Sequence, residues 1–349
     1  MTKLPNKPKR ILLAEDSAVM RQLIRSWLGN NRGYDIVGQA RDGKEAAEMA
    51  AKFQPDLVLM DLFMGDYDGL YGVEQIMKSN CPCPILLLSA ASQGEELLLK
   101  ALAAGATDVL AKPSLRDGNL QHFGLELDQK IKAALATNLA QKPQAFASQA
   151  KHSFSTDLPY EMLLLGASTG GPATLEFILA QLPENWPLPI VIAQHMPQAF
   201  LPAFASRLQK LSKLKVSLAQ NGERPKPNQV YLAPGDHHLL LRGIPNDYLF
   251  AWSQRTHPSY NYPSVDALFE SAAEVIGKTL LGVLLTGMGS DGAKGLLAIK
   301  EAGGFTINQD EASSSIYGMP RAAQEIGASR RELSLSAIPP FLVQLLDME

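Results

Sequence analysis

The sequence predicts an α/β protein of two domains. Each is expected to be a doubly wound parallel sheet, five-stranded at the N-terminus and, at the C-terminus, accompanied by a β-hairpin. Short apolar runs alternate with helical patterns up to about residue 136, a stretch without apolar periodicity follows, and the alternation then resumes. A chain of 349 residues is long enough for two domains. We expect them over residues 8–136 and 159–349, joined by a linker over residues 137–158.

The first domain is expected to contain five strands, each followed by a helix. The strands are expected at Ile11–Ala14, Tyr34–Val37, Leu57–Met60, Ile85–Leu88 and Asp108–Leu110. The helices are expected at Val19–Leu28, Lys44–Ala51, Val73–Lys78, Glu95–Ala104 and Leu125–Ala136. Strands that alternate with helices in this way predict a parallel sheet, because consecutive parallel strands need a crossover connection.

The stretch after the last of these helices is rich in Gln, Ala, Ser and Lys and indicates a linker. In the second domain, strands are expected at Met162–Leu165, Ile190–Ala193 and Gly282–Thr286. Helices are expected at Ala173–Gln181, Phe200–Leu211 and Ala293–Glu301. A hairpin-bearing insertion, with a turn near residues 242–247, is predicted by the runs Val230–Ala233, His238–Arg242 and Tyr248–Trp252.

The composition is that of a globular protein, with 46% hydrophobic and 19% charged residues. The formal net charge is −3, from 32 Lys and Arg against 35 Asp and Glu, so we expect no nucleic-acid partner. Too few apolar residues follow the basic N-terminus to form a signal sequence or a membrane span. We therefore expect a cytoplasmic protein without membrane insertion. Cys81 and Cys83 are interpreted as reduced thiols in a loop before a strand.

Acidic residues follow two strands of the first predicted sheet. Glu15 and Asp16 end the first strand and Asp61 ends the third, so the three carboxylates should converge at the carboxyl edge of the sheet. Clustered carboxylates repel each other unless a cation joins them, and Mg²⁺ prefers such oxygen ligands. Ser89 and Lys112 end the fourth and fifth strands at the same edge. The set predicts a site for a phosphoryl group carried on Asp61; as the alternative, each carboxylate could be a helix N-cap.

The spacing of Glu15, Asp16, Asp61, Ser89 and Lys112 resembles the CheY-like receiver domains of two-component signalling. The resemblance implies that Asp61 is the phosphoacceptor and that Glu15, Asp16 and Asp61 hold the Mg²⁺ needed for phosphorylation. It also implies that Ser89 and Lys112 sense the phosphoryl group. A chemotaxis histidine kinase is the implied phosphodonor.

Two positions depart from the receiver pattern. Receivers often carry Glu-Met-Pro shortly after the phosphoacceptor, where this chain has Phe63-Met64-Gly65. The family contacts the metal there through a main-chain carbonyl, so metal binding is expected to survive the change. Val109 stands three residues before Lys112, where an aromatic switch residue is usual.

A glycine-rich turn lies between the first strand and the first helix of the second domain. Its residues, Gly166-Ala167-Ser168-Thr169-Gly170, match G-x-S-x-G, a turn that exposes a serine hydroxyl next to backbone N–H groups. A phosphate cradle or a tight packing turn has the same signature. His195 and Asp291 follow two other predicted strands, so one cleft could hold all three residues. The histidine would then deprotonate the serine and the aspartate would orient the histidine.

The order Ser…His…Asp of this triad differs from that of α/β-hydrolases, so that fold is not inferred.

Two alternative interpretations concern other residues of the second domain. His237, His238 and His257 are further histidines, for which a structural role is the simpler interpretation. The segment 287–292 also reads as G-x-G-x-x-G, with Asp310 near the end of the next strand, which would indicate a dinucleotide site. Asp291 argues against it, because a carboxylate in that turn would repel a pyrophosphate.

Several longer motifs of the second domain resemble the catalytic domain of the chemotaxis methylesterase family CheB. They are GASTGG, AQHMP, YLAPGDHHL, PSVD with LFESAA, LLTGMGSDGA and INQDEASSSIYGMPRAA. The resemblance implies hydrolysis of glutamyl methyl esters on methyl-accepting chemotaxis receptors, with glutamine deamidation, and needs no cofactor for ester hydrolysis. It implies attack by Ser168, proton relay by His195 and orientation by Asp291, with oxyanion donors at Met288 and Thr169.

The same resemblance implies that the unphosphorylated receiver covers the catalytic cleft and that phosphorylation relieves this block. The expected function is therefore a phosphorylation-activated esterase that produces adaptation in chemotaxis. The alternative is a non-catalytic signalling adaptor whose second domain only binds receptors.

Overall fold

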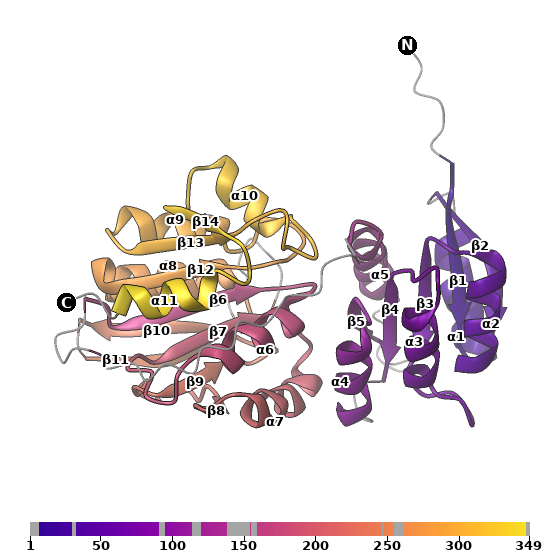
Figure 1. Ribbon diagram of the computed structural model, residues 1–349, viewed down its shortest axis with the longest axis horizontal. Helices are drawn as coiled ribbons and strands as arrows, with labels where there is room; N and C mark the ends of the chain where they lie inside the picture. The colour runs from indigo at the N-terminus through magenta and orange to yellow at the C-terminus, as the bar shows by residue number, and fades with distance from the viewer. Residues whose placement is uncertain are drawn as a thin grey trace, which may run out of the picture. The chain divides into compact units, whose positions relative to one another are not determined.

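The computed structural model describes residues 7–29, 33–90, 95–113, 120–137, 154, 159–245, 247–254 and 262–346. The chain divides into two compact units, residues 1–139 and 140–349, and each contains its own parallel sheet (Figure 1). Most of the linker expected over residues 137–158 lies outside the described residues.

The sheet of the first unit has the strand order β2-β1-β3-β4-β5, and all its pairs are parallel. Its strands are β1 (Lys9–Ala14), β2 (Tyr34–Ala40), β3 (Leu57–Asp61), β4 (Ile85–Ser89) and β5 (Asp108–Ala111). The predicted five-stranded parallel sheet is confirmed. Because β1 lies between β2 and β3, the strand order reverses there, and such a switch point opens a crevice at the carboxyl ends of the strands.

Helices cover both faces of this sheet. They are α1 (Ala18–Gly29), α2 (Gly43–Phe53), α3 (Gly69–Lys78), α4 (Glu95–Ala104) and α5 (Leu120–Leu135). Ile24 of α1 and Ile131 of α5 share a buried cluster with Leu57 and Leu59, which alternate along β3 and so point to one face. On the other face α2 packs against α3, and α3 against α4.

The sheet of the second unit has the order β14-β13-β12-β6-β7-β9-β8, also with parallel pairs throughout. Its strands are β6 (Met162–Ala167), β7 (Ile190–Gln194), β8 (Lys215–Leu218), β9 (Gln229–Leu232), β12 (Leu280–Leu284), β13 (Phe305–Gln309) and β14 (Arg331–Leu333). The sequence did not predict β8 and β14. Both are short and only partly buried, so neither carries a continuous apolar run.

The predicted hairpin is confirmed as the antiparallel pair β10 (His238–Ile244) and β11 (Asp247–Ser253). The run Val230–Ala233, expected in the same insertion, instead overlaps β9, which pairs in parallel with β7 and β8. The helices of this unit are α6 (Gly171–Gln181), α7 (Leu201–Leu211), α8 (Val265–Val275), α9 (Ala293–Glu301), α10 (Met319–Glu325) and α11 (Ile338–Leu346). The sequence reading did not assign α8, α10 and α11. Nearly every side chain of α8 is buried, which removes the polar face by which a surface helix is recognised.

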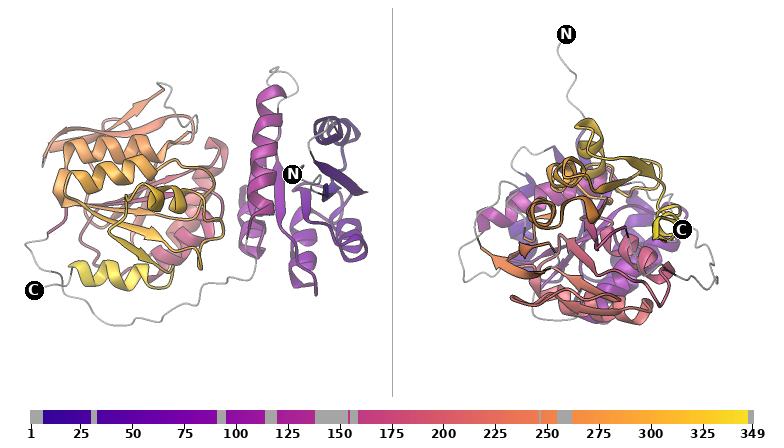
Figure 2. Two further views of the ribbon diagram at one scale, coloured as in Figure 1. Left: turned by 90° about the horizontal axis from the view of Figure 1, so that it is seen from above. Right: turned by 90° about the vertical axis from the view of Figure 1, so that its left-hand side faces the viewer.

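The core of the second unit lies where α8 and α9 run side by side over the sheet, with α11 on the opposite side (Figure 2). Phe269 of α8 and Leu296 of α9 share a buried cluster with Met162 and Leu164 of β6. Phe250 of the hairpin joins the same cluster, so β10 and β11 extend this core.

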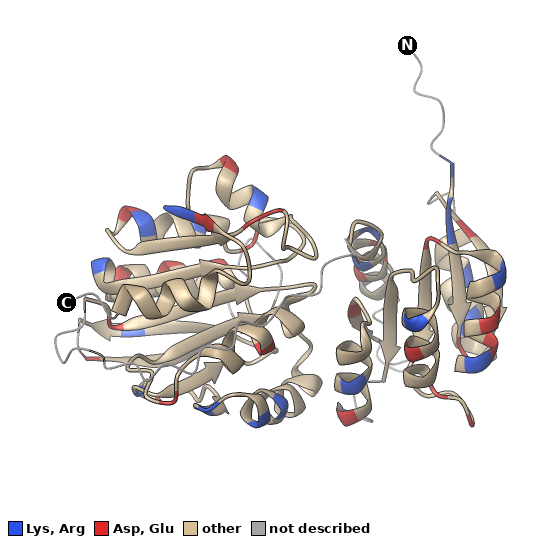
Figure 3. Cartoon of the chain, viewed as in Figure 1, with Lys and Arg blue, Asp and Glu red and all other residues tan. Residues whose placement is uncertain are grey.

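Basic and acidic residues are interspersed on the helices of both units (Figure 3). Within the described ranges, no helix combines the length and apolar character needed to cross a bilayer. Cys81 and Cys83 are free thiols before β4, as expected.

Helices α2 and α3 approach each other closely at glycines, so an added side chain there should destabilise the first unit. A Cβ added to Gly43 would lie 2.1 Å from the carbonyl oxygen of Asp68 and 2.8 Å from the backbone nitrogen of Gly72. We expect Gly43→Ala to lower the free energy of unfolding of the first unit by about 1–3 kcal/mol, the usual cost of overpacking. Gly29→Ala is the control, because nothing lies within 4 Å of its added Cβ. Hydrogen-exchange mass spectrometry of the full chain resolves the two units, and equal protection in both variants would contradict the prediction.

Candidate functional site

The end of β6 turns sharply into α6, and this turn presents Ser168. The N–H of Ser168 donates to the carbonyl of Thr286 at 3.0 Å, and the N–H of Gly171 donates back to the carbonyl of Ser168 at 2.8 Å. Gly170 has φ 78°, and a Cβ there would lie 2.6 Å from Ser315. The turn therefore requires glycine at this position and holds Ser168 at the carboxyl end of β6.

His195 directly follows β7, the neighbour of β6. Its N–H donates to the carbonyl of Ala167 at 3.1 Å, which ties it to the residue before Ser168. The side-chain amide of Gln194 donates to the carbonyl oxygens of Ser168 and His195, at 2.9 and 3.0 Å. Backbone and side-chain hydrogen bonds thus fix Ser168 and His195 next to each other.

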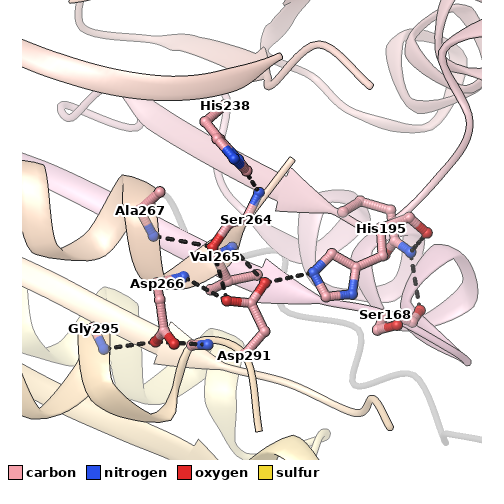
Figure 4. A network of polar contacts seen from close by, with 11 residues as sticks. Ser168, His195, His238, Ser264, Val265, Asp266, Ala267, Asp291 and Gly295 are labelled. Atoms are coloured by element: carbon pink, nitrogen blue, oxygen red, sulfur yellow. Dashed lines mark hydrogen bonds and ion pairs between the residues drawn. The ribbon is translucent and has the colours of Figure 1, made fainter. Parts of the chain in front are cut away.

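Asp291 lies in the loop after β12, the other neighbour of β6, and its carboxylate is nearly fully buried. Four contacts converge on it (Figure 4). Oδ2 lies 2.7 Å from Nε2 of His195 and accepts from the N–H of Val265 at 2.8 Å. Oδ1 accepts from the hydroxyl of Ser264 at 2.9 Å and from the N–H of Asp266 at 3.0 Å. The structure thus brings the three residues singled out in the second domain to three adjacent strands.

Figure 4 shows the ring of His195 between Asp291 and Ser168. Because Nε2 faces the carboxylate, the tautomer with a proton on Nε2 leaves Nδ1 able to accept a proton. Among the described residues, the hydroxyl of Ser168 makes no hydrogen bond to His195. Such contacts are often long before a substrate binds and tighten in the complex.

Asp291 stays ionised in this buried position. Burial by itself raises its pKa, but the hydrogen bond and charge of His195, together with the N–H groups of Asp266 and Val265, lower the pKa to about 2. An ionised carboxylate favours the Nε2–H tautomer of His195 and would stabilise the imidazolium form. The arrangement can therefore support nucleophilic catalysis at a carbonyl.

The two expected oxyanion donors are Met288, which follows a residue in contact with Ser168, and Thr169, which follows Ser168 itself. Gly287 approaches so closely that a Cβ there would lie 2.8 Å from Cβ of Ser168. The next residue, Met288, is half-buried, and within the described part of the chain its N–H makes no hydrogen bond. Thr169 follows Ser168, and its carbonyl accepts from the hydroxyl of Thr286 at 3.0 Å.

The other histidines occupy different surroundings. Nδ1 of the buried His238 accepts from the N–H of Ser264 at 3.1 Å, and its ring stacks on Tyr262 with centroids 4.4 Å apart. His237 contacts Asp236 at 2.9 Å, and His257 lies outside the described residues. His238 thus supports the backbone that leads into α8.

The five singled-out residues of the first unit also meet at one sheet edge. Oxygens of Glu15, Asp16 and Asp61 all lie within 4.8 Å of one another. Nζ of Lys112 lies 2.8 Å from Oε2 of Glu15 and 2.6 Å from Oδ2 of Asp61. Glu15, Asp61 and Ser89 are buried, whereas Asp16 is exposed. The result is an acidic pocket that reaches the surface at Asp16.

The electrostatics of this pocket favour a bound cation. Burial raises the pKa of Glu15 to about 7; the charge of Asp61 adds to the effect and Lys112 opposes it. A carboxyl whose ionisation is this costly gains from added positive charge, and the donor set consists of the oxygen ligands that Mg²⁺ prefers. The pocket is typical of Mg²⁺ binding.

Of the two departures from the receiver pattern, one contacts this pocket. The N–H of Phe63 donates to Oδ1 of Asp61 at 3.2 Å, so the loop after β3 contacts the carboxylate. Val109 is buried within β5.

Several residues that build the second site were not singled out from the sequence. Gln194 holds Ser168 and His195, and Thr286 links two loops by accepting from the N–H of Ile316 at 2.9 Å. Asp266 lies next to Asp291. PSVD contains Ser264 and Asp266, but nothing in the motif indicates that α8 begins against Asp291.

Two family models match the chain, one for each unit. The model described as CheB methylesterase matches residues 163–342, and the model described as response regulator receiver domain matches residues 11–122.

Curated relatives match over nearly the whole length. The protein-glutamate methylesterase/protein-glutamine glutaminase 2 of Hahella chejuensis is 38% identical, with 97% of each chain covered. The protein of the same description from Pseudomonas aeruginosa is also 38% identical, with 97% of each chain covered. Among solved structures, the CheB methylesterase catalytic domain of Thermotoga maritima is 39% identical, with a TM-score of 0.52. That match covers 53% of this chain and 98% of the other.

The ionisation of Asp266 should make the stability of the second unit depend on pH. Burial raises its pKa from 3.8 to about 6; N–H donors from Gly295 and Gly292 oppose the shift, and the charges of Asp291 and Glu270 add to it. Because the pKa is higher in the folded state, the folded state binds more protons. The contribution of Asp266 to the free energy of unfolding is therefore fully present below about pH 4, near its ordinary pKa. It is lost as the pH rises through 6, its pKa in the folded state.

We expect Asp266→Asn to remove this dependence, so that the decrease in unfolding free energy from pH 5 to pH 7 is about 1 kcal/mol smaller than in the wild type. Hydrogen-exchange mass spectrometry of the second unit at the two pH values measures the difference. Glu274→Gln, at an exposed position of the same helix, serves as the control. Equal slopes for the wild type and Asp266→Asn would contradict the assignment.

Proposed function

The chain belongs to the CheB methylesterase family and carries a response-regulator receiver domain, and on this premise we propose that it is a phosphorylation-activated protein-glutamate methylesterase and protein-glutamine glutaminase. Its substrates are methyl-accepting chemotaxis receptors and its phosphodonor is a chemotaxis histidine kinase. It acts in the cytoplasm and produces adaptation in chemotaxis. The receiver comprises residues 8–136, the linker residues 137–158 and the methylesterase domain residues 159–349.

The observation that carries this proposal is that Ser168, His195 and Asp291 follow the carboxyl ends of adjacent strands, with a 2.7 Å contact between His195 and Asp291. In the proposed reaction, Oγ of Ser168 attacks the carbonyl carbon of the glutamyl methyl ester while Nδ1 of His195 takes the hydroxyl proton. The carbonyl oxygen becomes an oxyanion, which accepts from the N–H groups of Met288 and Thr169. One such donor is typically worth about 2.7–4 kcal/mol.

The tetrahedral intermediate then collapses. The bond to the methoxy oxygen breaks, His195 returns its proton to that oxygen, and methanol leaves an acyl enzyme on Ser168. A water molecule, deprotonated by His195, then attacks the acyl carbon. The bond between that carbon and Oγ of Ser168 breaks, His195 returns the proton to Oγ, and the glutamate side chain leaves as a carboxylic acid that ionises. A glutamine amide follows the same course with ammonia as the leaving group. Asp291 remains ionised throughout and balances the imidazolium, and the hydrolysis needs no cofactor.

In the receiver, Asp61 accepts the phosphoryl group, and Ser89 and Lys112 contact it. Glu15, Asp16 and Asp61 hold Mg²⁺, which supplies positive charge against the phosphoryl oxygens. The contacts of Lys112 with Glu15 and Asp61 support this assignment, because the same ammonium can turn from the carboxylates to a phosphoryl oxygen. The unphosphorylated receiver restrains the methylesterase domain, and phosphorylation of Asp61 relieves the restraint.

Ser168→Ala tests the chemistry. We expect it to lower methanol release from a methyl-esterified receptor fragment by about 10⁶-fold, because the nucleophile is lost, and to leave receptor binding intact. Ser206→Ala, at an exposed position of α7, is the matched control and should retain full activity. Binding of receptor without methanol release by the wild-type chain would instead indicate a signalling adaptor.

Asp61→Asn tests the regulation. We expect this variant to keep the methanol release seen without a phosphodonor and to lose all stimulation by a small phosphodonor with Mg²⁺. EDTA should have the same effect on the wild type, because the hydrolytic site needs no metal. Asp66→Asn is the control: Asp66 is an exposed carboxylate in the loop that follows Asp61, and this variant should still be stimulated. Stimulation of Asp61→Asn would show that another residue is the phosphoacceptor.

A further inference from the structure

Helices α8 and α9 begin side by side, and each N-terminus is held by a carboxylate from the other segment (Figure 4). The carboxylate of Asp291, just before α9, accepts from three groups at the start of α8: the hydroxyl of Ser264 and the N–H groups of Val265 and Asp266. The carboxylate of Asp266, in the first turn of α8, reaches back to the start of α9.

One carboxylate oxygen of Asp266 makes both hydrogen bonds to the start of α9. Oδ1 of Asp266 accepts from the N–H of Gly292 at 2.8 Å and from the N–H of Gly295 at 2.7 Å. Gly292 directly follows Asp291 and is the N-cap residue of α9. Having no side chain, it offers the helix no cap of its own, so Asp266 supplies the acceptor that the first turn would otherwise lack.

The N-termini of α8 and α9 are both buried, and for this reason the hydrogen bonds between them matter to the stability of the unit. Asp266 is 6% exposed and Asp291 5% exposed, so water cannot readily replace either carboxylate as acceptor. The first turn of a helix also carries partial positive charge, which favours an anion at each position. Removing Asp266 would leave two buried N–H groups unpaired next to Asp291, and the loop would have to move to satisfy them.

We propose that Asp266 is a positioning residue that holds the backbone of Gly292 and thereby fixes the carboxylate of Asp291 against His195. This inference rests on the proposed function for its kinetic consequence. Among the described residues, Asp266 makes no hydrogen bond or ion pair with His195 or Ser168, and it acts only through Asp291. A displacement of about 1 Å at a catalytic group can cost on the order of 10²-fold in rate.

The kinetic test uses the full chain and methanol release from a methyl-esterified receptor fragment. We expect Asp266→Ala to lower kcat by about 10²-fold with KM changed less than about twofold, because the side chain of Asp266 is buried and does not form part of the surface that meets a receptor. Asp266→Asn keeps an acceptor oxygen at the same place and should restore kcat to within a few-fold of the wild type. Glu274→Ala, on the exposed side of α8, should match the wild type.

A second measurement does not depend on activity. The proton shared by His195 and Asp291 should give a low-field ¹H NMR signal in the wild-type chain, assigned by its loss in His195→Gln. We expect the signal to persist in Asp266→Asn and to vanish in Asp266→Ala at a temperature where circular dichroism shows both to be folded. If the alanine variant fails to fold, Asp266→Ser replaces it, because its short side chain cannot reach both N–H groups.

The outcomes separate the two proposals. An unchanged signal and kcat in Asp266→Ala, with release still dependent on Ser168, would overturn the positioning role and leave the function standing. A wild type that releases no methanol, but whose signal is lost in Asp266→Ala, would overturn the function and support the positioning role. A rise in KM with constant kcat, or no recovery in Asp266→Asn, would also count against positioning.

Discussion

A parallel sheet brings the carboxyl ends of neighbouring strands to one edge, and both sites of this chain are built on that constraint. In the first unit, Glu15 follows β1 and Asp61 ends β3, and these strands are neighbours where the strand order reverses. In the second unit, β6 lies between β7 and β12, so the residues that follow these strands meet although they are far apart in sequence. The buried strands on either side make the edge rigid, which suits chemistry that depends on position.

The two sites stabilise buried negative charge by different means. In the receiver, an ammonium does so: Lys112 lies between Glu15 and Asp61, and the pKa of Glu15 is still raised to about 7 by burial. In the methylesterase domain, His195 and the backbone N–H groups of Asp266 and Val265 lower the pKa of Asp291 to about 2 against the effect of burial. The two domains thus hold buried carboxylates by different chemistry, one with a side-chain ammonium and the other with backbone donors and a histidine.

Much of the fold could be predicted from local pattern, because long apolar runs between helical segments specify buried parallel strands. The five strands of the receiver and the hairpin of the second unit were predicted in this way. The short strands β8 and β14 were not, since three or four partly exposed residues carry no clear period. The same limit applies to α8, whose burial on nearly all sides hides its amphipathic signal.

The sequence by itself determined which chemical groups stand at the strand ends: carboxylates and a lysine in one domain, and a serine, a histidine and an aspartate in the other. Glycine turns and strand ends are local features, so their spacing can be read directly. Only the tertiary structure decided which groups support them. Gln194 beside Ser168, and Asp266 across from Gly292, owe their roles to backbone atoms brought close by β6–β7 pairing and by α8–α9 packing. Nothing local encodes such contacts, because each depends on where a distant backbone N–H or carbonyl comes to lie.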